Sequence, residues 1–326
     1  MLTAFSASGT QVVDPGTASC AGSLQGAIWI DLLDPSPQET RAVESALGIE
    51  LPTRKEIQEI EVSSRLYVEK QTVFMTMTVM VQADTPHPET TPVTFAYQPQ
   101  RLVTLRFAEP TPFTTFPAKF LRAPEAFGSA QKLFIGLVDE IIERVADILE
   151  SVGSDLNAVS RIIFAEAGPQ PVKKPSVDYT AALTRIGHNG ERLANARESL
   201  VSISRLLPFF AEACPGPVAE PLDEHWLTVS KDVSALSDHT TFLSNKVNFF
   251  LDATLGHINI EQNSIIKLFS VLAVIFLPPT LVASIYGMNF EHMPELKWSL
   301  GYPFSFFLIV LSAILPYVFF KRKGWF

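Results

Sequence analysis

The stretch LFSVLAVIFLPPTLVASIYGMNF, from Leu268 to Phe290, contains no charged residue, and neither does the stretch from Trp298 to Phe320. Each is 23 residues long, enough for a helix to cross the roughly 30 Å hydrocarbon core of a bilayer. Only the seven residues Glu291–Lys297 separate them. The sequence therefore predicts two membrane-spanning helices joined as a hairpin, with both outer flanks on one side of the membrane.

Positive charge flanks the open side of this hairpin. Lys267 precedes the first stretch, and the basic run Lys321–Lys323 follows the second. The connecting loop carries Glu291 and Glu295 against Lys297. Because basic residues favour the cytoplasmic side, both termini are predicted to be cytoplasmic and the short acidic loop to lie outside.

Composition limits the other possibilities. The 326 residues are 47% hydrophobic and 18% charged, with a net charge of −9. No basic patch suggests a nucleic-acid partner, and no P-loop, dinucleotide-binding motif or nucleophile–base pattern suggests an enzyme. The two cysteines lack metal-ligand spacing, and the N-terminus lacks the features of a signal peptide. The large polar body is therefore predicted to be cytoplasmic.

The first part of the chain mixes strand and helix signals. Capping boxes at Ser36–Glu39 and Thr53–Glu56 predict two helix starts. The Pro-rich segment Ala83–Pro92 is typical of a hairpin loop. Short apolar or β-branched runs between turn signals predict strands at Leu2–Phe5, Ala27–Leu33, Leu66–Glu69, Val73–Val81, Val93–Tyr97 and Leu102–Phe107.

Helical spacing dominates after about residue 130. Apolar residues recur every three or four positions from Leu137 to Ile163, and a second helix is predicted over Val177–Phe210. The breaks Gly168–Pro171 and Pro215–Pro221 bracket the second helix, which predicts an antiparallel helical hairpin. A third pattern has no Gly-Pro break before the first uncharged stretch, so one very long helix is predicted from Leu222 to Tyr286.

The predicted fold class is thus an α+β membrane protein. Its predicted segments are a cytoplasmic α/β domain (1–127), a helical hairpin (128–221), a cytoplasmic stalk (222–267), a first transmembrane helix (268–290), an outer loop (291–297), and a second transmembrane helix with a basic cytoplasmic end (298–326).

Two helices cannot enclose an aqueous path, so a pore requires several copies around an axis. One face of the long helix combines a polar inner end, an apolar middle that could gate by dewetting, and hydroxyls near the outer end. Such a stripe could equally be ordinary helix packing, in which Ser and Thr bond their own backbone. Spacing alone leaves both readings open for Asp252, Asn259, Asn263, Ile266, Phe269, Ala273, Leu277, Thr280 and Ser284.

The segment Tyr286–Asn289, followed by FEHMPEL at 290–296, resembles the signature of CorA magnesium channels. The resemblance continues through IEQN at 260–263, FLPPT at 276–280 and WIDL at 29–32. It implies a homopentamer in a bacterial inner membrane that passes Mg²⁺, Co²⁺ and Ni²⁺. Five Asn289 side chains, with the carbonyls of Gly287 and Met288, would form its outer mouth.

The chemistry of this mouth suits a hydrated ion. Mg²⁺ gives up water reluctantly and prefers octahedral oxygen ligands, and amide and carbonyl oxygens can accept hydrogen bonds from its bound waters. Glu291 and Glu295 could raise the local cation concentration. No cofactor is expected, with Mg²⁺ as substrate. The resemblance also implies regulation by cytoplasmic Mg²⁺, for which the stalk offers Asp223, Glu224, Asp232 and Asp238.

Two alternatives remain. One is Zn²⁺ transport, although His292 has no second His or Cys at ligand spacing and the Met-Pro-Glu-Leu context favours magnesium and cobalt. The other is a membrane-anchored helical scaffold that conducts nothing, which would leave the Gly-Met-Asn sequence without a role.

Overall fold

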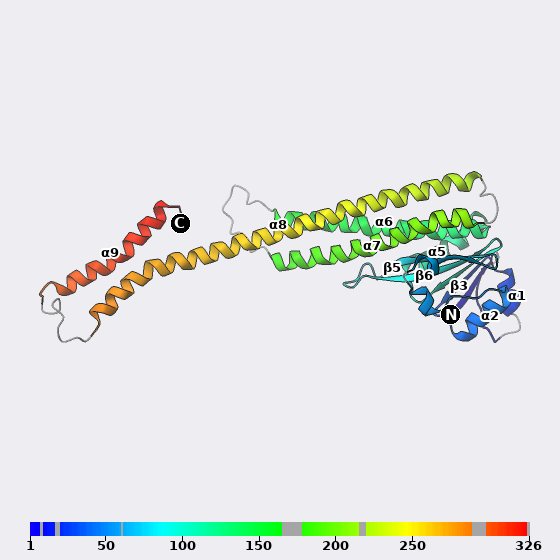
Figure 1. The fold of residues 1–326 in the computed structure, drawn as a ribbon, viewed down its shortest axis with the longest axis horizontal. Helices are drawn as coiled ribbons and strands as arrows, with labels where there is room; N and C mark the ends of the chain where they lie inside the picture. Colours follow the sequence, from blue (N-terminus) through cyan, green and yellow to red (C-terminus); the bar gives the residue numbers. More distant parts are fainter. Residues whose placement is uncertain are drawn as a thin grey trace. The chain divides into compact units, whose positions relative to one another are not determined.

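The computed structural model describes residues 1–6, 9–16, 20–59, 61–164, 178–214, 220–288 and 298–324. The chain divides into two compact units, Met1–Leu251 and Asp252–Phe326. The first holds a mixed sheet and a set of long helices, and the second holds two long apolar helices. This agrees with the predicted α+β class (Figure 1).

The first unit is built on a seven-stranded sheet with the strand order β2-β1-β3-β7-β6-β5-β4. Its only parallel pair within the described residues is β3 with β7, where Trp29 lies opposite Leu102. All other neighbours are antiparallel. The strands are β1 (Leu2–Ser6), β2 (Gly9–Val12), β3 (Trp29–Leu33), β4 (Leu66–Glu69), β5 (Thr72–Val81), β6 (Glu89–Gln98) and β7 (Arg101–Arg106).

The predicted hairpin loop Ala83–Pro92 is wrong at its end, because β6 already begins at Glu89. Pro92 lies opposite Thr78 of β5, whose N–H points away from β6 and donates to Ser202 Oγ. The backbone nitrogen of Pro92, which carries no hydrogen, therefore faces the β7 side, where β7 pairs with β6 only from Val93 onward. The proline removes no ladder hydrogen bond there, so the strand tolerates it.

Short helices cover one face of the sheet, and both predicted capping boxes are confirmed. At the start of α2, the N–H of Glu39 donates to Ser36 Oγ, and the Glu39 carboxylate accepts from the Ser36 N–H at 2.8 Å. Thr53 and Glu56 repeat this arrangement at α3. These elements are α1 (Cys20–Gly26), α2 (Pro37–Leu47), α3 (Arg54–Ile57) and α4 (Val62–Arg65).

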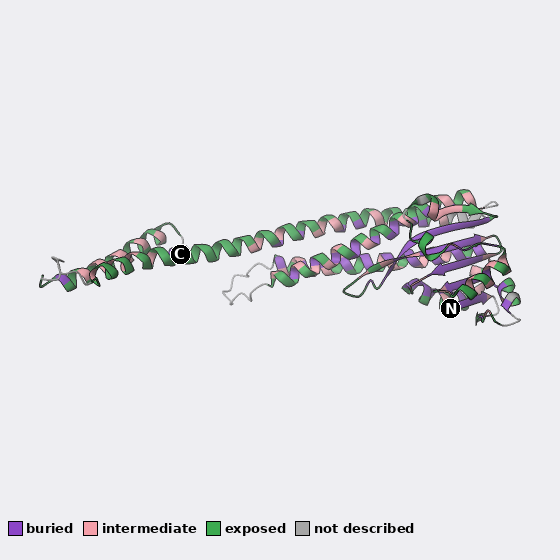
Figure 2. Ribbon diagram, turned by 60° about the horizontal axis from the view of Figure 1, so that its bottom comes forward, coloured by how far each residue is buried: buried purple, intermediate pink, exposed green. Residues whose placement is uncertain are grey.

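The opposite face carries an aromatic core. The rings of Phe5 and Trp29 stack at 4.1 Å, and Phe116 meets Trp29 edge-on at 5.8 Å. Phe116 belongs to α5 (Thr111–Arg122), which the sequence analysis did not predict, and η1 (Pro124–Phe127) follows it. Figure 2 shows the central strands of the sheet as buried, which is why they read as nearly continuous apolar runs.

A buried ion pair connects the central parallel strands. Arg106 Nη2 donates to Asp31 Oδ2 at 2.8 Å, and Thr104 donates to Asp31 Oδ1 at 2.6 Å. Trp29 Nε1 in turn donates to Thr104 Oγ1 at 3.0 Å. Both charged side chains are nearly inaccessible to solvent, so the loss of either one would leave the other charge buried without its ion-pair partner.

Three long helices complete the first unit: α6 (Ala130–Ile163), α7 (Tyr179–Ala213) and the first part of α8 (Glu220–Tyr286). Asp155 of α6 contacts both Arg185 and Asn189 of α7. Ser151, which precedes Asp155 on α6, accepts a hydrogen bond from Arg192, which follows Arg185 and Asn189 on α7. This crossing order confirms the predicted antiparallel hairpin, whose predicted break Gly168–Pro171 lies outside the described residues.

Helix α8 runs alongside α6 in the same direction. His225 contacts Asp139 at 2.5 Å, and Lys246 donates to Asn157 at 2.6 Å. The helix continues unbroken to Tyr286, which confirms the predicted long helix from Leu222 to Tyr286. The predicted break Pro215–Pro221 overlaps the start of α8 at Glu220, and its first five residues lie outside the described part of the chain.

The second unit contains the remainder of α8 and helix α9 (Gly301–Arg322). Both α8 and α9 are long and apolar enough to cross a membrane. Helix α9 begins at Gly301, three residues later than the start of the uncharged stretch at Trp298, because Trp298–Leu300 forms a turn. Two candidate membrane helices are therefore present where the sequence predicts them.

Candidate ion pathway

Large apolar side chains are exposed along the helices of the second unit. Phe269 is 67% exposed, Leu277 66% and Ile266 62%. Figure 2 shows both helices of this unit as largely exposed. Apolar surface of this extent requires lipid or another protein surface around it, which agrees with a membrane location.

All nine residues of the predicted stripe are exposed along one side of α8. Four of them, Ala273, Leu277, Thr280 and Ser284, line a shallow groove in the middle of the apolar stretch, together with Phe276 and Leu281. Asp252, Asn259 and Asn263 lie at the other end of the stripe, with Ile266 and Phe269 between the two ends. Within one chain the stripe thus remains an open helix surface, polar at both ends.

Thr280 holds its hydroxyl in a defined direction. Its Oγ1 donates to the carbonyl oxygen of Phe276 at 2.7 Å, so the lone pairs of Oγ1 remain available as acceptors. The two prolines just before it, Pro278 and Pro279, lack the N–H groups that a helix would use there. Toward its end α8 bends (Figure 1), as helices do at prolines. The result is a hydroxyl oxygen and freed backbone carbonyls close together on an apolar helix.

Phe276 was absent from the predicted stripe, although it lines the groove and its carbonyl oxygen accepts the Thr280 hydrogen bond. The signal that could have identified it is the four-residue spacing to Thr280, since Ser and Thr in helices often bond the carbonyl four positions earlier. Ser270 does the same with Ile266 at 2.8 Å. Hydroxyls that bond the backbone of their own helix, one of the two interpretations left open by the spacing, therefore occur on α8.

The first two residues of the Gly-Met-Asn sequence close the C-terminal end of α8. The N–H of Gly287 donates to Ala283 O at 2.9 Å, and the N–H of Met288 reaches back to Ile285 O at 3.3 Å. A Cβ added at Gly287 would lie 3.1 Å from Ala283 O, closer than side chains normally approach a carbonyl. Glycine thus allows the helix to end in this tightened turn. Asn289, Glu291, His292 and Glu295 lie outside the described residues.

The family model described as CorA-like Mg²⁺ transporter protein matches residues 25–322. The chain belongs to the CorA-like Mg²⁺ transporter family. The magnesium transport protein CorA of Salmonella typhimurium is 38% identical over 305 residues, which cover 93% of each chain. Its counterparts in Escherichia coli and Yersinia pseudotuberculosis are 38% and 37% identical over 304 and 302 residues, again with 93% coverage of both chains.

Solved structures agree with this family assignment at the level of the fold. The complete CorA magnesium transporter from Methanocaldococcus jannaschii matches with a TM-score of 0.73 at 18% identity, covering 100% of this chain and 98% of that one. The full-length CmaX protein matches with a TM-score of 0.66 at 16% identity, covering 91% and 88%. The CorA-like family is one of transporters rather than enzymes.

Two of the four acidic residues predicted for regulation, Asp232 and Asp238, have described side chains. Asp232 and Asp238 are exposed on α8. Asp223 and Glu224 lie near the start of the same helix, but their side chains are outside the described part. Among the described residues, no group of three or more His, Cys, Asp and Glu side chains is placed to hold a metal ion.

One polar contact of α8 was missed by the sequence analysis. Burial raises the pKa of Asp139, against the opposing effect of the hydrogen bond and charge of His225. Lys119 of α5 bonds Glu140 at 3.0 Å beside this pair. The partners are 86 residues apart in the sequence, and neither carries a local motif. This contact fixes the beginning of α8 against α6 in the first unit.

Proposed function

We propose that this chain is one subunit of a homopentameric channel that admits Mg²⁺ along the membrane potential. The observation that carries the proposal is the exposed stripe from Asp252 to Ser284, which leads to Gly287 and Met288 at the end of an apolar helix. Five such stripes facing an axis would line a path with polar ends and an apolar middle. The 38% identity to magnesium transport proteins supports the ion.

The mouth is proposed to hold the ion with its water shell. The Asn289 amides and the carbonyls of Gly287 and Met288 would accept hydrogen bonds from those waters, as would Thr280 Oγ1, whose own proton is committed to Phe276. Glu291 and Glu295 would raise the cation concentration outside. Neutral oxygens bind Mg²⁺ weakly enough for it to move on, whereas a ring of carboxylates would retain it.

The ions that pass the channel, and the signal that closes it, are also proposed. Co²⁺ and Ni²⁺, which prefer similar octahedral surroundings, are proposed as further substrates. Cytoplasmic Mg²⁺ is proposed to close the channel by joining carboxylates of neighbouring copies, with Asp223, Glu224, Asp232 and Asp238 as candidates. The exposure of Asp232 and Asp238 supports this role. The channel is placed in the bacterial inner membrane with both termini cytoplasmic.

The test is flux into liposomes that contain the purified full chain. Asn289→Ala is expected to abolish Mg²⁺ uptake while the oligomer, measured by light scattering in detergent, still forms. Ser305→Ala is the control, because Ser305 lies near the start of α9 and its hydroxyl donates to Tyr302 O of the same helix. Unchanged uptake by Asn289→Ala would contradict the mouth assignment.

A second measurement addresses the ion and the gate. Uptake of Mg²⁺, Co²⁺, Ni²⁺ and Zn²⁺ is compared with and without Mg²⁺ inside the liposomes. Mg²⁺ uptake that falls when internal Mg²⁺ is present is the expected result. Preferential uptake of Zn²⁺ would establish the alternative transporter, and no uptake of any ion would favour the scaffold.

A further inference from the structure

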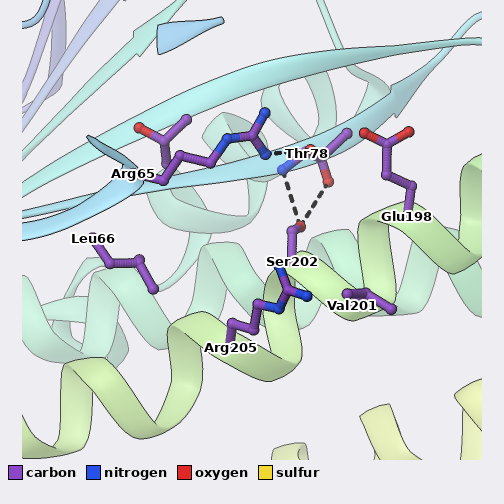
Figure 3. A pocket seen from close by; sticks show the side chains of 8 residues that line it. Arg65, Leu66, Thr78, Glu198, Val201, Ser202 and Arg205 are labelled. Atoms are coloured by element: carbon purple, nitrogen blue, oxygen red, sulfur yellow. Dashed lines mark hydrogen bonds between the residues drawn. The ribbon is translucent and has the colours of Figure 1, made fainter. Parts of the chain in front are cut away.

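A concave pocket lies in the first unit, between the sheet and α7 (Figure 3). It is far in sequence from the proposed pathway, and the proposed function does not use it. Its walls combine two arginines, one glutamate and several hydroxyls. The lining residues are Arg65, Leu66, Thr76, Thr78, Glu198, Val201, Ser202 and Arg205.

The pocket exists because the edge strand β4 is shorter than its neighbour β5. Pairing between them ends at Leu66 opposite Met75, while β5 continues to Val81. Beyond that point the backbone of β5 has no strand partner on this side. Ser202 of α7 replaces the missing strand partner there, because its Oγ accepts a hydrogen bond from the Thr78 N–H at 3.0 Å. The hydroxyl thus fixes α7 to the open edge and leaves a hollow beside it.

Arg65 is held rigidly on the sheet side of this hollow. Its Nε donates to Glu59 O at 2.7 Å, and its Nη1 donates to Thr78 Oγ1 at 3.2 Å. A guanidinium has five N–H donors, so three remain for a ligand. The hydrogen bonds orient the group in advance, which lowers the entropy lost on binding.

Arg205 lies on the α7 wall, opposite Arg65 (Figure 3). It is exposed. Among the described residues, no carboxylate forms an ion pair with Arg205 or with Arg65. Two guanidinium groups therefore line one cavity without a direct ion pair among the described residues, in a protein whose net charge is −9.

Glu198 limits where an anion can sit. It precedes Arg205 by seven residues on α7, about two helical turns or roughly 10 Å along the axis. Its carboxylate disfavours negative charge at that end of the pocket. The anionic group of a ligand is therefore directed to the Arg205 end, and any hydroxyl or amino group to the Glu198 end.

We propose that this pocket binds a small oxyanion, a phosphate or a short carboxylate, between the guanidinium groups of Arg65 and Arg205. Arginine forms paired, charge-assisted hydrogen bonds with both kinds of group. The cavity volume of about 240 Å³ is below the ~300–1,000 Å³ of pockets for drug-sized ligands. A molecule of a few heavy atoms fits, and a nucleotide does not.

The test is titration calorimetry on the purified full chain in detergent, in low-salt buffer passed over a chelating resin to remove metal ions. Inorganic phosphate and lactate are the two probes, and they separate a tetrahedral ligand from a planar one. Saturable binding of at least one, with one site per chain, is expected. The absence of saturable binding for both would overturn the proposal.

Arg205→Gln is the decisive variant, because the Arg205 side chain carries no ion pair among the described residues and its loss should leave the fold intact. It is expected to weaken binding about tenfold, the effect of losing one charge-assisted contact. Arg197→Gln removes an equal charge from the same helix outside the pocket and is expected to change affinity less than twofold. Equal affinity in the wild type and Arg205→Gln would place the anion elsewhere.

Two further variants locate the ligand within the pocket. Glu198→Gln is expected to tighten binding severalfold by removing a repulsive charge, and unchanged or weaker binding would contradict the proposed position. Arg65→Gln is expected to weaken binding like Arg205→Gln. Arg65 also donates to Glu59 O, so its replacement could disturb the local fold. The melting temperature of Arg65→Gln is therefore measured together with its affinity, and the affinity is compared with that of Arg205→Gln.

Discussion

The two units of this chain use apolar side chains in opposite ways. In Met1–Leu251, large side chains such as Trp29 and Phe116 are completely buried. In Asp252–Phe326, side chains of similar size such as Phe269 and Leu277 are about two-thirds exposed. The first unit therefore carries its own core, while the second must obtain its apolar surroundings from lipid or from another protein surface. The predictions below test this contrast.

The largest effect is expected in the core of the first unit. Asp31→Ala leaves Arg106 buried without its carboxylate partner. Breaking a buried pair in this way typically costs about 3–5 kcal/mol of unfolding free energy. Hydrogen–deuterium exchange of the full chain in detergent should show faster exchange in peptides that cover β3 and β7.

The matched control is Asp84→Ala, which breaks an exposed pair with Arg144. Solvent screens that pair, so its loss should cost at most about 1 kcal/mol. Equal protection of β3 in the wild type and Asp31→Ala would show that the first unit does not depend on this buried network.

A slightly smaller effect is expected when the same substitution is made in each unit. Val310 of α9 is 39% exposed, and Val68 of the edge strand β4 is 54% exposed. Arginine near the middle of a membrane helix costs about 3 kcal/mol, whereas an exposed edge strand accepts charge readily. Val310→Arg should therefore reduce the amount of protein recovered in membranes, and Val68→Arg should not.

Both valines are exposed in the single chain, and Val68 is the more exposed of the two. If both side chains faced water, arginine would be tolerated at both positions and the two variants would be recovered in equal amounts. Equal recovery of Val310→Arg and wild type in the membrane fraction would place α9 outside the bilayer.

Much of the fold could be predicted because its signals are local. The capping box at Ser36 needs only four consecutive residues, and the absence of a Gly-Pro break was enough to predict continuous α8. The strand β2 and the helix α5 were missed. The four residues of β2 are mostly exposed and show no apolar alternation. Helix α5 does place buried Phe113, Phe116 and Phe120 at helical spacing, but it also contains Pro117, a residue that normally argues against a helix. Their formation depends on packing against the sheet.

The candidate pathway divides in the same way. Helical spacing placed Ala273, Leu277, Thr280 and Ser284 on one face, and the structure gathers them along one groove. Their role in conduction stays a prediction, because a pore needs several copies. The contact of Asp139 with His225 could not be predicted, since it depends on how three helices pack.

The third prediction concerns that groove. Thr280→Val keeps the shape of the side chain but removes the hydroxyl oxygen, which is proposed to accept hydrogen bonds from hydrated Mg²⁺. The loss of one such contact should reduce flux about tenfold. Ser312→Ala in α9 is the control, because its hydroxyl also bonds the backbone of its own helix, at Ile309. Equal loss of flux in both variants would point to general damage to the membrane helices.

The smallest effect is a pH dependence confined to the first unit. Burial raises the pKa of Asp155, but the hydrogen bonds from Arg185 and Asn189 and the charge of Arg185 outweigh it, so the pKa lies below its ordinary value of 3.8. A lowered pKa stabilises the folded state above the unfolded value, and this stability is lost as pH falls through the folded value.

Asp155→Asn should therefore lower stability at pH 7 by about 1 kcal/mol, a modest value because the pair with Arg185 is partly exposed. The difference in melting temperature between the wild type and this variant should shrink as pH falls below about 4. Asp147→Asn removes an exposed carboxylate from the same helix and should show little difference at either pH. A difference for Asp155→Asn that persists unchanged at low pH would mean that its carboxylate acts through packing rather than charge.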